Sequence, residues 1–188
     1  PNSVTTIRES AFTRTQLTNV TIPNRDTNIA DNAFDSNVII TIGDPTDDPN
    51  HLVIPDGTIE ITRDMVPRTT TSVTIPNSVT TIRGDAFKNT QLTNVNIPNS
   101  VTSIGAYAFA RTQLTNVTIP SSVTSIVEGV FAYTELTDVT IPNSVQSIGE
   151  RAFYGTPLTN VTIPNSVTTI ANYAFKLTQL TNVTIPES

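Results

Sequence analysis

The sequence is built on a repeat of 22 residues, and this period constrains the fold more than any other feature. The dipeptide Ile-Pro recurs at a constant spacing of 22 residues, beginning at Ile75, Ile97, Ile119, Ile141, Ile163 and Ile185. A unit of this length is too small to bury its own apolar side, so it must stack on neighbouring copies. The period therefore predicts a repeat solenoid.

The copies predict one solenoid domain over residues 1–188, interrupted by an irregular insertion at about residues 43–53. The insertion reads GDPTDDPNHLV, in which Pro, Asp and Asn favour loops and turns. A degenerate copy follows at residues 54–74, where Met65 and Val66 replace the usual Ala-Phe pair. Five further copies then run without a gap to Thr184.

Within one copy, apolar residues alternate along a short strand that ends at an Ile-Pro dipeptide. Strands are predicted near residues 92–97, 114–119, 136–141 and 158–163, pairing in parallel on one face. The following stretch is too short for an independent helix, so the other face should carry irregular or short helical arcs. The arcs should bury a ladder of aromatic rings, namely Phe12, Phe34, Phe87, Phe109, Phe131, Phe153 and Phe175.

The segment LTNVNIPNSVTSIGAYAF at residues 92–109 resembles the BspA-like leucine-rich repeats of bacterial and protozoan surface proteins, whose pattern is LxxLxLPxxLxxIxxxAF. The resemblance implies a curved solenoid, an extracellular or cell-surface location and a binding or adhesion role. Two positions depart from the family. Its general Asn is replaced by Ser78, Ser100, Ser122, Ser144 and Ser166, and its frequent Cys is replaced by Thr90, Thr112, Thr134, Thr156 and Thr178.

Composition excludes several classes of protein. The net charge of −6 argues against nucleic acid, because phosphate recognition needs clustered Lys and Arg. The chain has no cysteine and one histidine, and no catalytic constellation stands out, so neither an enzyme nor a cofactor is expected. No apolar run long enough for a membrane span is present. The chain begins inside a repeat, so it resembles a piece of a longer array with which it could associate.

Two columns of polar residues should be exposed on the strands and form the first candidate binding site. They offer a regular, almost uncharged hydrogen-bonding surface, although Thr also favours strands for structural reasons alone. Some of these Asn residues stand in N-V-T glycosylation patterns that the repeat itself explains. The candidate residues are Asn94, Asn96, Asn116, Thr118, Asp138, Thr140, Asn160 and Thr162.

The acidic insertion is the second candidate binding site. Asp44, Asp47 and Asp48 lie close together in the sequence, and His51 follows them. The spacing lacks the order of known calcium loops, so a solvated acidic turn is favoured and no metal is assigned.

Two functions follow from these surfaces. The favoured one is a binding or adhesion module that recognises a protein or glycan ligand through the strand face, the insertion or both. The alternative is a structural or surface-lattice protein, including one that binds ice through its Asn and Thr columns.

Overall fold

The computed structural model describes residues 6–22, 28–30, 32–36, 38–42 and 48–185. The chain divides into two compact units, Pro1–Pro49 and Asn50–Ser188. The expectation of one continuous domain over residues 1–188 spans both units and stays a prediction.

The first unit contains two parallel strand pairs. Strand β1 (Thr6–Ile7) pairs with β3 (Asn28–Ile29), and β2 (Asn19–Ile22) pairs with β4 (Ile39–Ile42). The rings of Phe12 and Phe34 stack with centroids 5.0 Å apart, as predicted, but Phe12 is 40% exposed, so the prediction that this ring is buried is wrong.

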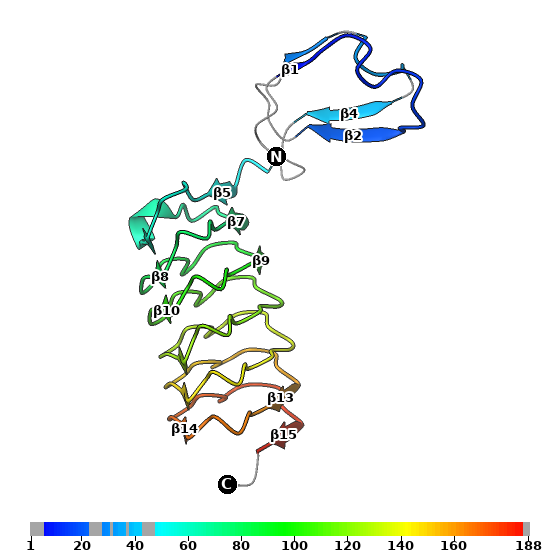
Figure 1. Cartoon of the computed structure of the whole chain (residues 1–188). Coiled ribbons are helices and arrows are strands. Elements are labelled where there is room, and N and C mark those ends of the chain that lie inside the picture. Colours follow the sequence, from blue (N-terminus) through cyan, green and yellow to red (C-terminus); the bar gives the residue numbers. More distant parts are fainter. Residues whose placement is uncertain (1–5, 23–27, 31, 37, 43–47, 186–188) are drawn as a thin grey trace. The chain divides into compact units, whose positions relative to one another are not determined.

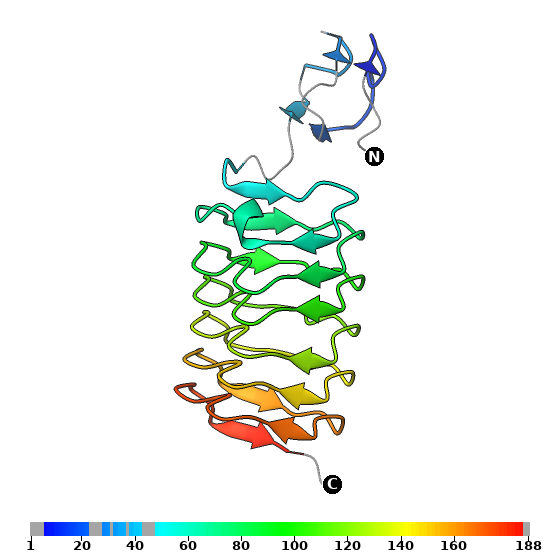
Figure 2. The ribbon, with the colours of Figure 1, turned by 90° about the vertical axis from the view of Figure 1, so that its left-hand side faces the viewer.

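The second unit is a stack of coils with short parallel strands on two sides, shown in Figures 1 and 2. The side that we call the Asn-Thr side carries the strands that end before each Ile-Pro. They are shorter than expected, and at residues 114–119 and 136–141 only a bridge between Thr118 and Thr140 remains. The strands are β5 (His51–Val53), β7 (Ser72–Thr74), β9 (Asn94–Val95), β13 (Asn160–Thr162) and β15 (Asn182–Thr184), and the pairs are β5–β7, β7–β9 and β13–β15.

A second row of parallel strands lies on the opposite side of the stack, which we call the Ser-Ile side (Figure 1). This row was not anticipated from the sequence. Each strand is only two residues long, so it is too short to show an alternating pattern. The strands form two sheets, β6 (Glu60–Ile61), β8 (Thr81–Ile82) and β10 (Ser103–Ile104), and β11 (Ser125–Ile126), β12 (Ser147–Ile148) and β14 (Thr169–Ile170).

The arcs that follow the Ser-Ile strands are turns rather than helices. In each later copy, two residues four positions apart adopt left-handed backbone, for example Tyr107 and Arg111 with φ of 57°. The backbone N–H groups of Tyr107, Phe109 and Arg111 donate to carbonyls of the next copy over 2.8–3.0 Å. Backbone groups that a helix would pair internally are thus paired between copies.

The core of the second unit is one continuous apolar cluster. The predicted ring ladder is confirmed, since Phe87, Phe109, Phe131, Phe153 and Phe175 stack with successive centroids 5.2–5.7 Å apart. Threonine at the family's Cys position closes each arc, because its hydroxyl donates to the carbonyl of the Phe three residues earlier. The bonds from Thr90, Thr112, Thr134 and Thr156 measure 2.7–2.9 Å and are buried.

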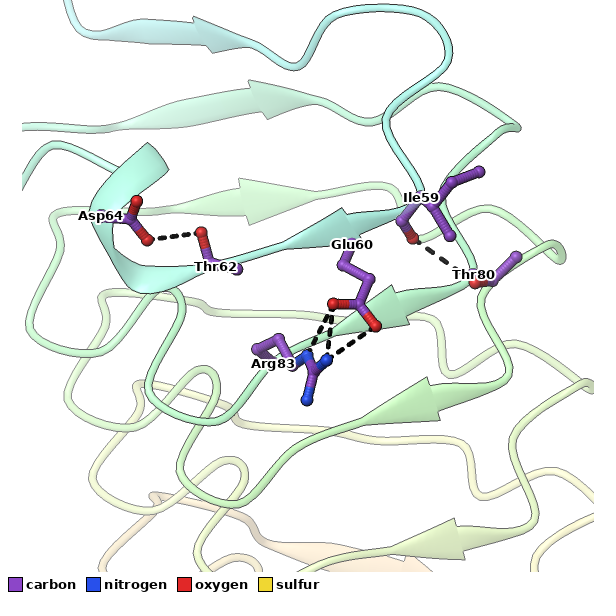
Figure 3. Close-up of polar contacts among 6 residues, drawn as sticks. All are labelled: Ile59, Glu60, Thr62, Asp64, Thr80 and Arg83. Atoms are coloured by element: carbon purple, nitrogen blue, oxygen red, sulfur yellow. Dashed lines mark hydrogen bonds and ion pairs between the residues drawn. The ribbon is translucent and has the colours of Figure 1, made fainter.

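The first copy of this unit departs from the others. Its arc contains the 3-10 helix η1 (Arg63–Met65), and the Arg63 guanidinium donates to the Val66 carbonyl over 2.6 Å. On its Ser-Ile side, Arg83 forms a bidentate pair with Glu60, with N–O distances of 2.7–2.9 Å (Figure 3). The arc that contains η1 is thus accompanied by two side-chain contacts, the Arg63–Val66 hydrogen bond and the Arg83–Glu60 ion pair.

Candidate functional site

The predicted columns come together on the Asn-Thr side. Every second side chain of a strand points outward, so buried Val95, Val139 and Val161 alternate with exposed polar residues. Strand register places His51, Ser72 and Asn94 in one column, and Asn160 beside Asn182 further along the stack. The exposed candidates are Asn94, Asn96, Asn116, Thr118, Asp138, Thr140, Asn160 and Thr162.

A hollow of about 320 Å³ interrupts this face where the strand ladder opens. Among the described residues, no strand pairing joins the segment at Asp138–Ile141 to β13, although Phe131 and Phe153 still stack beneath it. Polar groups of two adjacent copies therefore face one space. The lining residues are Asp138, Val139, Thr140, Ile141, Asn143, Asn160, Val161, Thr162 and Pro164.

Four sequence-predicted residues therefore share the hollow, namely Asp138, Thr140, Asn160 and Thr162, while Asn94, Asn96, Asn116 and Thr118 lie outside it. The sequence analysis missed Asn143 and Pro164, which also line it. The sequence does mark both residues, because each belongs to a Pro-Asn turn that follows a strand. Only the position of the hollow in the structure, which no residue pattern announces, shows which of the repeated turns takes part.

His51 belongs to the strand face rather than to an irregular loop. It begins β5, with its Nδ1 atom 2.7 Å from Ser72 Oγ and its Nε2 atom 2.9 Å from Thr74 Oγ1. The run His-Leu-Val-Ile-Pro thus takes the place of Asn-Val-Thr-Ile-Pro in other copies. This corrects the C-terminal bound of the expected insertion, since residues 51–53 form a strand of the repeat.

The acidic part of the insertion is only partly described. Asp44 and Asp47 lie outside the described residues, and Asp48 belongs to the first unit, two residues before the second unit begins at Asn50. A joint site with His51 therefore stays a prediction. In the part of the chain that the structure covers, no three His, Cys, Asp or Glu side chains are grouped as metal ligands.

Two titrating groups near the arcs are perturbed. The Tyr107 hydroxyl donates to Glu128, and this bond raises the pKa of the tyrosine. The Thr62 hydroxyl donates to Asp64 over 2.6 Å, which lowers the pKa of that carboxyl (Figure 3). The Tyr107 bond joins two adjacent copies and the Asp64 bond is local, and neither group lines the hollow.

Known proteins resemble this chain in fold and repeat. Its residues 1–47 and 65–181 match the model of the BspA type leucine rich repeat region, with six copies. A leucine-rich repeat protein from Bacteroides ovatus ATCC 8483 is 25% identical, with a TM-score of 0.54 over 98% of this chain and 53% of that one. One from Eubacterium ventriosum ATCC 27560 is 21% identical, with a TM-score of 0.51 over 97% and 64%.

The chain thus spans about half to two thirds of the length of these structures. No curated protein matches the sequence. No helix among the described residues is long and apolar enough to cross a membrane. Because the family model covers most of the sequence and the coils stack as that repeat requires, the chain belongs to the BspA-type leucine-rich repeat family.

Proposed function

We propose that this chain is a binding module of a cell-surface or secreted protein, and that the hollow on its Asn-Thr side recognises a glycan. The observation that carries the proposal is the group of polar side chains that two copies present to one space. Asp138, Asn143 and Asn160 offer carboxylate and amide groups, and Thr140 and Thr162 offer hydroxyls.

These groups suit a neutral, polyhydroxylated ligand. Carboxylate and amide oxygens accept hydrogen bonds from sugar hydroxyls, while amide nitrogens donate to them. Pro164 and the edges of Val139 and Val161 add apolar surface for the sugar ring. No Lys or Arg lines the hollow, so an anionic ligand would find no counter-charge there.

The family supports a surface location. Proteins with BspA-like repeats are often surface-exposed adhesins that bind host or matrix proteins, and the second unit here exposes a polar strand face. No constellation of nucleophile and base accompanies the hollow's lining residues, which favours binding over catalysis at this place.

The test compares two asparagines at the same repeat position. The whole chain is screened against a glycan array, and the affinity for any bound glycan is measured by calorimetry. Asn160→Ala should weaken binding about tenfold, or about 1.4 kcal/mol. Asn94→Ala, which lies in the same column outside the hollow, should change affinity less than about twofold.

Equal losses in the two variants would contradict a site at the hollow, and binding of proteins but no glycan would contradict the ligand class. Ice binding remains the second candidate, because Thr118 pairs with Thr140, and Thr162 with Thr184, on an exposed face. Thermal hysteresis of the whole chain that is lost in Thr118→Ala would favour ice over glycan.

A further inference from the structure

The arcs carry a second surface that the strand face does not explain. All four tyrosines of the chain lie on arcs of the second unit, as do Lys88, Arg111, Arg151 and Lys176. Tyrosine and arginine are the side chains most enriched at the energetic centres of protein interfaces. The arcs are therefore candidates for contact with another protein.

Four of these residues form a line across four consecutive copies, which we call the arc strip. The Arg111 guanidinium lies 4.6 Å from the centroid of the Tyr133 ring, and Tyr133 meets Tyr154 edge to face at 5.3 Å. Lys176 takes the position of Tyr154 in the next copy, and its carbonyl accepts a hydrogen bond from the Gly155 N–H. The strip thus has a cation at each end and two aromatic rings between them.

A hollow of about 310 Å³ opens beside the strip. Tyr133, Gly155 and Leu177 occupy the same position in three successive copies and line this hollow, and the Tyr133 ring lies against Gly155, where a β-carbon would come within 3.0 Å of it. Tyr133 is 45% exposed and Leu177 is 64% exposed. The rim is completed by Thr134, Glu135, Thr156, Pro157 and Gln179.

The two cations of the strip contact aromatic rings rather than carboxylates, since the Lys176 ammonium lies 4.9 Å from the centroid of the Tyr173 ring as Arg111 does near Tyr133. Lys88 pairs with Asp85 over 2.7 Å, and Arg151 pairs with Glu150 over 2.6 Å. Among the described residues, no carboxylate forms an ion pair with Arg111 or Lys176. Both are exposed at the surface, so each can receive a carboxylate from outside.

We propose that the arc strip binds an extended protein segment with two carboxylates four residues apart and an apolar side chain midway between them. Three steps between stacked copies span about 14 Å, and four residues of extended chain span about 13 Å. Side chains at the first, third and fifth positions of an extended segment share one face. Its acids would meet Arg111 and Lys176 while its central side chain enters the hollow at Gly155.

The surroundings favour this order of charges. Glu135 at the rim of the hollow would repel a central carboxylate, so the central position should be apolar. A nucleic acid would present a continuous row of phosphates, which a chain of net charge −6 with two isolated cations does not match. This surface is separate from the glycan hollow, since the two share no lining residue.

The test uses a labelled, capped peptide of sequence Gly-Glu-Ser-Phe-Ser-Glu-Gly and the whole chain, with binding followed by fluorescence anisotropy. Arg111→Glu should weaken binding at least tenfold, and Tyr133→Asn should do the same. Asparagine tolerates the left-handed backbone at position 133, so that variant removes the ring without new strain. Binding to the unmodified chain should also weaken with added salt.

Matched controls separate the strip from general effects. Arg68→Glu makes the same charge change at an exposed site outside the strip, and Tyr107→Asn removes another arc tyrosine at a left-handed position. Both should leave affinity within about twofold. Circular dichroism of each variant verifies that the fold is retained.

Three results would overturn the proposal. The first is that the peptide shows no saturable binding to the unmodified chain, and the second is that a peptide with Ala in place of Phe binds equally well. The third is that the strip variants and their controls lose the same amount of affinity. Self-association of the chain that Arg111→Glu abolishes, without peptide binding, would assign the strip to a second copy instead.

Discussion

The first copy of the second unit differs from the copies that follow it in how its arc is packed and hydrogen-bonded. In the later copies, Phe rings stack on each other and alternate N–H groups of each arc bond to the next copy. In the first copy, Val66 replaces the ring and the 3-10 turn at residues 63–65 bonds within itself. The regular arcs thus pair alternate backbone N–H groups with the next copy, whereas the arc at residues 63–65 pairs its backbone N–H groups within itself.

The largest expected effect comes from removing a stacked ring. Phe131 is 1% exposed between two other rings, so Phe131→Ala should cost about 3–5 kcal/mol of unfolding free energy. Val66→Ala removes only two methyl groups from the first copy and should cost about 1–2 kcal/mol. Urea denaturation measures both. Equal costs would show that the Phe131 ring is not packed as its burial and its two ring contacts indicate.

A smaller effect should follow from deleting one arc-closing hydroxyl. Thr134 is 1% exposed, and its hydroxyl donates to the Phe131 carbonyl over 2.9 Å. Thr134→Val keeps the shape but buries an apolar group against that carbonyl, so it should cost about 1–2 kcal/mol. Thr137→Val, at an exposed position of the same copy, is the control and should be near neutral in the same denaturation experiment.

The smallest effect should come from the surface pair of the first copy. The side chains of Arg83 and Glu60 are 58% and 41% exposed, so solvent screens their attraction. Glu60→Gln should therefore cost less than about 1 kcal/mol. The loss should vanish in denaturations at high salt, and a loss that persists there would mean that the bidentate geometry matters more than the charge.

Much of the fold could be predicted from the sequence. The 22-residue period, the parallel pairing and the ring ladder follow from residues whose spacing is visible in one dimension, such as Ile97, Phe109 and Phe131. The Ser-Ile strands could not be predicted, because strands of two residues such as Thr81–Ile82 carry no alternation. The left-handed arcs were also hidden, since Tyr107 and Arg111 are not residues that signal this conformation.

The candidate sites show the same division. The polar columns could be predicted, because a strand period exposes every second residue. The hollow at Asp138 and Asn160 lies between two copies that have nearly the same sequence as the others, so no residue pattern marks its position. The arc strip joins Arg111, Tyr133 and Tyr154, whose adjacency appears only when the coils are stacked.

The contact between Tyr107 and Gly129 limits how such an array can gain or lose copies. A β-carbon built on Gly129 would lie 2.1 Å from the Tyr107 ring, so the aromatic residue in one copy requires glycine in the next. Deleting residues 112–133 would bring Arg151 against that ring, while Gly155 would lose Tyr133. Recombination between these repeats is therefore not neutral even when the 22-residue phase is kept. A crossover between residues 107 and 129 would separate Tyr107 from Gly129 and place another side chain against the tyrosine ring. We therefore expect such a crossover to destabilise the array.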